Sequence, residues 1–115
     1  MYTFNIIWFS WGENQTFLQV INSDGTYTFL KGKYVIDVKL GQVENDNSIQ
    51  IYESNNTGAQ KFYLKEEGDG YVSIHFSLNG DYVIDVPGGS PDNCNRIILF
   101  KYHGRANQKF KFISV

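Results

Sequence analysis

The chain has 115 residues, 42% of them hydrophobic and 17% aromatic, and a formal net charge of −2. We therefore expect one compact domain over residues 1–115 and exclude a disordered chain, which requires low hydrophobicity and high net charge. Nucleic-acid binding relies on clustered Lys and Arg. The sequence has no such cluster, so we expect no nucleic-acid partner.

The sequence has no features of membrane insertion or disulfide bonding. Cys94 is the only cysteine, so no disulfide can form within the chain. No apolar run approaches the ~20 residues that a transmembrane helix needs. The N-terminal residues have neither a basic leader nor a small-residue cleavage site, so we expect no signal peptide. The cellular compartment stays open.

The predicted elements are short strands rich in β-branched and aromatic residues. No apolar spacing of 3.6 extends beyond one turn, so almost no helix is expected. SDG at 23–25, GDG at 68–70 and NG at 79–80 predict tight turns, because Asn and Gly tolerate positive φ. In chain order, the predicted strands cover residues 5–10, 16–22, 26–31, 33–38, 48–53, 60–66, 71–78, 81–86, 96–102 and 108–114.

An internal repeat relates most of these strands. Residues 34–67 recur as residues 82–115 at a constant offset of 48, with YVIDV repeated at 34–38 and 82–86. QKF at 60–62 recurs at 108–110, and a partial third copy has QTF at 15–17. A fixed period of this size indicates units that bury their apolar faces against one another. We expect three repeats, at about residues 1–32, 33–80 and 81–115.

The strand count leaves one question open. Three four-strand units of antiparallel hairpins would form a closed barrel capped by hairpins, with twelve strands in all. The sequence predicts only ten strands. The first repeat lacks its opening strand and the third repeat lacks its closing strand. Either the termini fill the gap, with residues 1–4 beside the strand at 108–114, or a second chain does, as a homodimer or a partner chain. We favour closure within one chain, because residues 1–4 are largely apolar.

The order of the motifs resembles the ricin-B-type β-trefoil lectin repeat. The third repeat has Asp85-Val86, GGS at 88–90, a short apolar strand with an aromatic, and NQKF at 107–110. The second has Asp37, QIY at 50–52 and AQKF at 59–62, and the first has NQTF at 14–17. Phe stands where the family usually has Trp. The resemblance implies an all-β fold, a β-trefoil of three pseudo-symmetric repeats, with Phe17, Phe62 and Phe110 in the core.

The resemblance also implies sugar-binding residues. In the family an Asp accepts hydrogen bonds from two vicinal hydroxyls, an aromatic ring stacks on the sugar and an Asn adds a polar contact. In the third repeat, this assigns carbohydrate binding to Asp85, Phe100, Tyr102, Asn107 and Gln108.

The second repeat carries a less complete set, namely Asp37, Gln50, Tyr52 and Gln60, with Ala59 at the Asn position. We expect the third repeat to be the best site, the second a weaker one, and the first inactive. A structural role competes with this one, because an Asp that ends a strand beside a turn commonly caps backbone N–H groups.

No catalytic or metal-binding pattern stands out in the sequence. His75 and His103 lie far apart and have no Cys or carboxylate at metal-ligand spacing. Glu66 and Glu67 are adjacent on a strand and so point to opposite faces, unlike a glycosidase pair. We expect no enzyme, no metal and no cofactor. The leading hypothesis is a non-catalytic lectin module for galactose-type or N-acetylgalactosamine-type glycans. The alternative is a β-trefoil protein-interaction or assembly module that has lost sugar binding.

Overall fold

The computed structural model describes residues 2–8, 14–87 and 97–114. This part of the chain is all-β, with short 3-10 turns as its only helical elements. The 3-10 turns are η1 (Lys39–Gly41), η2 (Gly58–Gln60) and η4 (Ala106–Gln108). The strands are β1 (Tyr2–Trp8), β2 (Asn14–Ile21), β3 (Tyr27–Lys31), β4 (Tyr34–Val38), β5 (Asn47–Glu53), β6 (Phe62–Gly68), β7 (Tyr71–Phe76), β8 (Asn79–Asp85), β9 (Ile98–Lys101) and β10 (Phe110–Ser114).

The predicted strands and the observed strands agree one to one, with shifts at the ends. Residues 9–10 and 96 of the predicted strands lie outside the described residues. One difference concerns Gln60 and Gln108, which were placed at the starts of strands but belong to η2 and η4. Each strand begins two residues later, at a Phe that enters the core.

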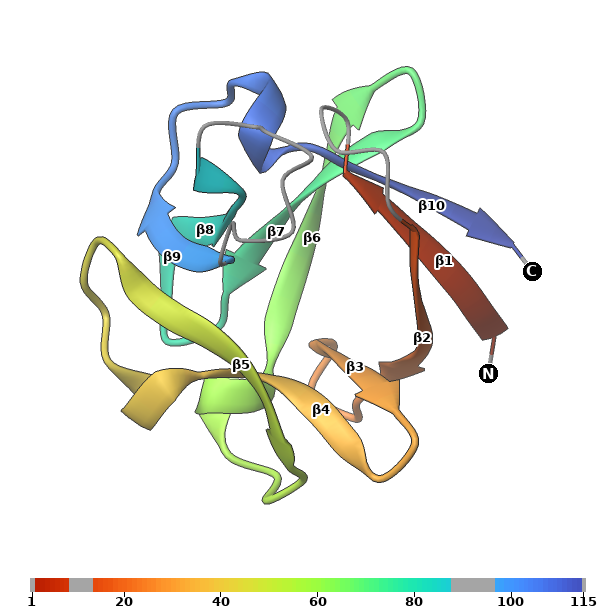
Figure 1. The fold of residues 1–115 in the computed structure, drawn as a ribbon, viewed down its shortest axis with the longest axis vertical. Coiled ribbons are helices and arrows are strands. Elements are labelled where there is room, and N and C mark those ends of the chain that lie inside the picture. Colours follow the sequence, from red (N-terminus) through yellow and green to blue (C-terminus); the bar gives the residue numbers. More distant parts are fainter. Residues whose placement is uncertain (1, 9–13, 88–96, 115) are drawn as a thin grey trace.

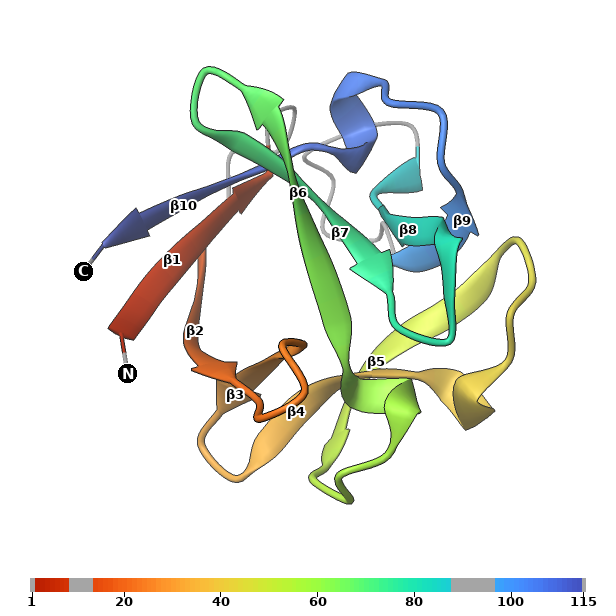
Figure 2. The same ribbon diagram turned by 180° about the vertical axis from the view of Figure 1, so that it is seen from behind.

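Six strands close a ring by antiparallel pairing. β1 pairs with β2, β2 with β3, β3 with β6, β6 with β7, β7 with β10, and β10 with β1. Phe4 lies opposite Ser114 and Trp8 opposite Phe110. The strand next to the C-terminus is thus supplied by this chain's own N-terminal segment. In Figure 1 both ends of the chain lie close together, and Figure 2 shows the same from behind.

The remaining strands form two hairpins that extend from the ring. β4 and β5 lie between β3 and β6 in sequence, and β8 and β9 lie between β7 and β10. The described residues thus contain two such hairpins, and residues 9–13, between β1 and β2, lie outside the described residues.

The strand registers repeat along the chain. Every pair of β2–β3 recurs in β6–β7 at an offset of 45, and four pairs of β4–β5 recur in β8–β9 at an offset of 48. Val20 opposite Thr28 becomes Lys65 opposite Ser73, for example. Positions related by these offsets therefore occupy matching places in the fold.

In the described residues, the buried core cluster combines five Phe rings with six Ile, Val and Leu side chains. Phe62 and Phe110 are fully buried and Phe17 is 5% exposed, which confirms the prediction that the repeated Phe residues are structural. Phe62 packs between Phe29 and Phe76, with ring centroids 6.1 and 6.0 Å away. Burial of these rings supplies much of the apolar stabilisation.

Candidate functional site

The first candidate site centres on Asp37, at the end of β4. Its carboxylate is 4% exposed. Gln50, its partner across the β4–β5 pair, donates from Nε2 to Oδ1 at 3.0 Å, and Gln60 donates from Nε2 to Oδ2 at 2.8 Å. Asp37 thus accepts one bond at each oxygen, and a carboxylate oxygen has a second acceptor position.

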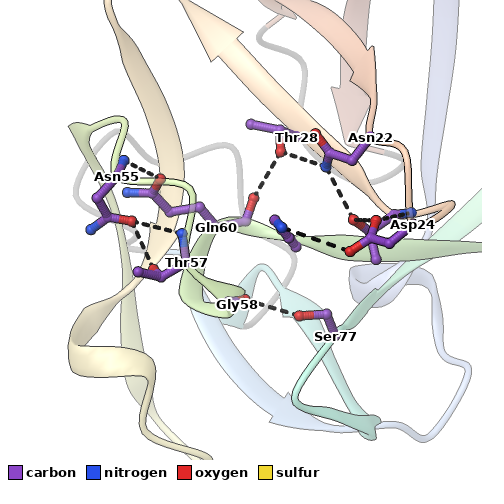
Figure 3. Close-up of polar contacts among 10 residues, drawn as sticks. Asn22, Asp24, Thr28, Asn55, Thr57, Gly58, Gln60 and Ser77 are labelled. Carbon is purple, nitrogen blue, oxygen red and sulfur yellow. Dashed lines mark hydrogen bonds and ion pairs between the residues drawn. The ribbon is translucent and has the colours of Figure 1, made fainter.

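Gln60 holds Asp37 in place through a fully bonded amide. Its Oε1 accepts from the backbone N–H of Asn55 at 2.9 Å (Figure 3), and its Nε2 also donates to the backbone oxygen of Glu53 at 2.8 Å. A backbone N–H can only donate, so Oε1 must face Asn55 and Nε2 must face the two acceptors. The orientation of this buried amide is therefore determined by its partners.

A cavity of about 600 Å³ opens above Asp37. Its lining includes the polar residues Gln50, Asn55 and Thr57. It also includes two exposed apolar side chains, Leu40 (79% exposed) and Leu78 (56% exposed). The full lining is Asp37, Lys39, Leu40, Gly41, Gln50, Tyr52, Asn55, Thr57, Gly58, Ala59 and Leu78.

Local backbone conformation and packing determine the positions of Leu40 and Leu78. Leu40 has a left-handed conformation, with φ of 56°, inside η1. A Cβ on Gly58 would lie 2.5 Å from Cδ2 of Leu78, so the absence of a side chain at Gly58 is what lets Leu78 lie against the turn. Tyr52, predicted as a stacking ring, is 52% exposed and lines the same cavity.

The third repeat carries a matching network around Asp85, at the end of β8. Asp85 is 3% exposed; Asn107 donates from Nδ2 to its Oδ1 at 3.0 Å, and Gln108 from Nε2 to its Oδ2 at 2.8 Å. Gln108 also donates to the backbone oxygen of Lys101 at 3.0 Å and accepts from the backbone N–H of His103 at 2.8 Å. Asn107 thus takes the role that Gln50 has beside Asp37.

Burial has the largest effect on the pKa of Asp85. It raises the pKa of the carboxyl above its ordinary value, and the hydrogen bonds from Gln108 and Asn107 and the nearby His103 offset only part of this rise. Nε2 of His103 lies 3.7 Å from Oδ2, and its ring packs edge-on to Phe100 with centroids 6.1 Å apart. Asp85, Phe100, Asn107 and Gln108 are therefore brought together, and the GGS turn at 88–90 lies outside the described residues.

Tyr102, in contrast, belongs to another cluster. Its hydroxyl donates to Glu67, with distances of 3.0 and 2.8 Å to the two carboxylate oxygens, and its ring lies 5.2 Å from that of His75. Nζ of Lys65 lies over the same ring at 4.8 Å. The bond to Glu67 raises the pKa of Tyr102. These contacts hold Tyr102 in a cluster that includes neither Asp85 nor Asn107.

The same cluster contains a serine, a histidine and a glutamate in hydrogen-bond reach, which sequence reasoning missed. The Oγ of Ser73 lies 2.8 Å from Nε2 of His75 and 2.8 Å from Oε2 of Glu67. Burial alone would raise the pKa of Glu67, but hydrogen bonds from Ser73 and Tyr102 and the nearby lysines lower it. Ser73 is fully buried. A substrate therefore has no access to its hydroxyl, and the arrangement serves packing rather than nucleophilic catalysis.

The described part of the chain has neither a metal-binding cluster nor a membrane-spanning helix. Residues 2–8, 14–87 and 97–114 hold no group of three or more His, Cys, Asp or Glu side chains suited to a metal ion. They also contain no helix of the length and apolar character needed to cross a membrane.

The cavity residues Asn55, Thr57, Leu40 and Leu78 were not predicted, because they come from turns that only the folded chain brings together.

Comparisons with known proteins identify the family and the fold. A family model described as a ricin-type β-trefoil lectin domain-like family matches residues 13–100. No curated protein sequence matches the chain. A designed threefold-symmetric protein, ThreeFoil, has a TM-score of 0.91 at 17% identity, covering 98% of this chain and 99% of its own.

Two larger proteins contain a similar part. The exo-β-1,3-galactanase 1,3Gal43A from Clostridium thermocellum has a TM-score of 0.90 at 20% identity, over 100% of this chain and 30% of its own. A mosquitocidal holotoxin has a TM-score of 0.81 at 10% identity, over 98% of this chain and 17% of its own. The chain thus spans less than a third of either protein. At these identities the likeness shows a shared β-trefoil-like fold.

Proposed function

The chain belongs to the ricin-type β-trefoil lectin-like domain family, and from that premise we propose that it is a non-catalytic carbohydrate-binding module for galactose-type sugars. We further propose that residues 1–115 form a single trefoil of three units. These units comprise β1–β2, β3–β6 and β7–β10, which moves each boundary one strand earlier than in the repeats expected at about residues 1–32, 33–80 and 81–115. The recurring strand registers and the ring of six strands support this division.

The main binding site is proposed from one observation. The buried Asp37 carboxylate lies in the 600 Å³ cavity, which the half-exposed ring of Tyr52 also lines. Each Asp37 oxygen already accepts one amide hydrogen, which fixes its direction and leaves acceptor capacity for two sugar hydroxyls. Tyr52 offers a flat face to the C–H groups of the sugar. Gln50 and Gln60 orient the carboxylate rather than reach for the ligand.

We propose the Asp85 cluster as a second site, with Phe100 as its ring and Asn107 and Gln108 as the amides that hold the carboxylate. This reverses the order expected from the sequence, in which the third repeat ranked first. The reason is that Asp37 lines a cavity of about 600 Å³ together with the exposed ring of Tyr52. Tyr102 is left out of this site because Glu67 and His75 hold it elsewhere.

A shallow site with one carboxylate and one ring should bind a monosaccharide with a Kd on the order of 0.1–10 mM. Tighter binding to a cell surface would use both sites or an oligomer, through effective concentration. Galactose and N-acetylgalactosamine, titrated by calorimetry or by NMR, are the first ligands to test.

The matched pair Asp37→Asn and Asp85→Asn tests the assignment. Asn keeps the size of the side chain but loses the charge and one acceptor. We expect Asp37→Asn to weaken galactose binding about tenfold or more, the equivalent of 1.4 kcal/mol, and Asp85→Asn to leave most of it intact. If both variants bind as the wild type does while remaining folded by circular dichroism, the carboxylate sites are refuted.

The exposed side chains of Leu40 and Leu78 favour a second candidate, an interaction or assembly module that uses the same face. Light scattering over a range of concentrations separates the two functions. A dimer that persists on dilution, that is broken by Leu78→Ser and that shows no sugar binding would replace the lectin proposal.

A further inference from the structure

A second cavity, of about 330 Å³, lies next to the Asp37 cavity and shares a wall with it. The loop that follows β5 alternates its side chains between the two, so that Ser54 and Asn56 line the second cavity while Asn55 and Thr57 line the first. Gln60 also lines the second cavity. The complete lining is Val20, Asn22, Thr28, Leu30, Val35, Ser54, Asn56, Gln60 and Lys61.

The lining combines an apolar surface with hydrogen-bonding groups held in position. Asn22 donates from Nδ2 to the hydroxyl of Thr28 at 2.9 Å, and Thr28 donates to the backbone oxygen of Gln60 at 3.3 Å (Figure 3). This chain of bonds links the β2–β3 side of the cavity to η2. Because both amide hydrogens of Asn22 are used, on Thr28 and on Thr26, its Oδ1 is the part left to accept from a ligand.

The charge of this cavity differs from that of the Asp37 cavity. Its lining contains one ionisable side chain, Lys61, and no carboxylate. Lys61 is paired outside the lining with Asp24, whose Oδ2 lies 3.7 Å from Nζ of Lys61 and whose side chain is 51% exposed, against 20% for Lys61. An ion pair of this distance and exposure is weak. A ligand anion inside the cavity can therefore compete for the ammonium group.

In the third unit, a side chain fills the space that is equivalent to this cavity. By the strand offsets, Asn22 and Thr28 correspond to Glu67 and Ser73, and Ser54 corresponds to Tyr102. Tyr102 closes that space by bonding to Glu67 and packing on His75. In the second unit a serine stands at the Tyr102 position, and the space stays open as the cavity.

From these observations we propose that this cavity is a second ligand site, specific for a small hydroxylated carboxylate of monosaccharide size, such as a hexuronate. Lys61 binds the carboxylate, Ser54, Asn56 and Asn22 bind hydroxyls, and Val20, Leu30 and Val35 take the apolar face. The volume is at the lower end of small-ligand sites, which run from about 300 Å³. The site uses neither Asp37 nor Tyr52, so this proposal and the proposed galactose site can be tested independently.

A variant that closes the second cavity can be designed by copying the residues that fill the equivalent space in the third unit. Ser54→Tyr alone would crowd Asn56, because Gly104 holds the matching position and a Cβ there would lie 3.1 Å from the Tyr102 hydroxyl. The double variant Ser54→Tyr with Asn56→Gly copies the third unit, and Asn56→Gly alone is its control. Lys61→Gln removes the charge without closing the cavity. Asp37→Asn controls for the first site.

The probe is D-galacturonate, with D-galactose as the neutral comparison, followed by calorimetry and by NMR of the side-chain amides. We expect galacturonate binding to weaken about tenfold or more in the double variant, which is at least 1.4 kcal/mol. Lys61→Gln should weaken it about three- to fivefold, as one partly exposed ion pair allows. Asp37→Asn should leave it unchanged, and in the wild type the amide signals of Asn22 and Asn56 should shift with galacturonate.

Three results would overturn the proposal. They are an absence of galacturonate binding to the wild type up to about 50 mM, equal binding by the folded double variant, and amide shifts at Gln50 instead of Asn22 and Asn56. If the double variant melts at a much lower temperature, Lys61→Gln and the wild-type amide shifts decide the question without it.

Discussion

Replacing Gln60 by Met should destabilise the protein more than any other substitution near the Asp37 cavity. Met has nearly the length of Gln and fills the same buried space, so the change removes hydrogen bonds with little change of volume. Three groups would lose a partner, namely Oδ2 of Asp37, the backbone oxygen of Glu53 and the backbone N–H of Asn55. Gln60 is 1% exposed, so water cannot easily replace the amide.

The expected magnitude follows from these three groups. Each buried polar group left without a partner costs about 1–3 kcal/mol. We take the sum as roughly 3–6 kcal/mol, a large part of the total stability of about 5–15 kcal/mol for a small domain. Urea denaturation followed by circular dichroism measures the free energy of unfolding directly.

Gln50→Met is the matched control. Gln50 donates one hydrogen bond to the same carboxylate, at Oδ1, but it is only half-buried and water can replace it. Its loss should cost roughly 0.5–1.5 kcal/mol. A Gln60→Met protein whose unfolding free energy lies within about 1 kcal/mol of the Gln50→Met value would refute the view that the buried amide holds this part of the fold.

Phe62→Ala should lower the free energy of unfolding by about 3–5 kcal/mol in the same assay, since the ring is fully buried; a loss below about 1 kcal/mol would contradict the core assignment. Tyr102→Phe removes the hydroxyl bonds to Glu67 and should cost about 1 kcal/mol while leaving galactose affinity unchanged; a loss of affinity would return Tyr102 to the binding site. Burial raises the pKa of Asp85 above 3.8, so its contribution to stability is largest below the unfolded-chain pKa and is lost as pH rises through the folded pKa. The melting temperature of the wild type minus that of Asp85→Asn should therefore be larger at about pH 3.5 than at about pH 7, and the opposite trend in thermal melts would mean that the pKa is lowered.

The strands were predictable because their cause is local. Alternation of apolar and polar residues, β-branched and aromatic content, and turn residues with positive φ act within a few positions of one another. The buried Phe at each QxF motif was predictable from recurrence, since Phe62 and Phe110 take matching places at a fixed offset. The repeat also revealed the family, whose model matches residues 13–100.

The side chains around the two aspartates were predicted only in part. The resemblance placed Asp37 with Gln50 and Gln60, and Asp85 with Asn107 and Gln108, and these pairs lie in hydrogen-bond contact. It also grouped Tyr102 with Asp85, but Tyr102 packs on His75 and bonds to Glu67. Phe100 and Tyr102 are two residues apart, a spacing that would place both on one face of a continuous strand. However, β9 ends at Lys101, so the strand pattern did not determine the direction of Tyr102.

The sequence by itself determined the all-β character, the strand positions, the repeated aromatic core and the family, because these depend on periodicity and recurrence along the chain. Only the tertiary structure decided which strands close the ring and which side chains line each cavity. Those outcomes depend on contacts between segments far apart in sequence, such as β1 with β10 and Thr28 with Gln60. A cavity exists only where side chains fail to fill the space between such segments, as at Ser54, whose counterpart Tyr102 fills it.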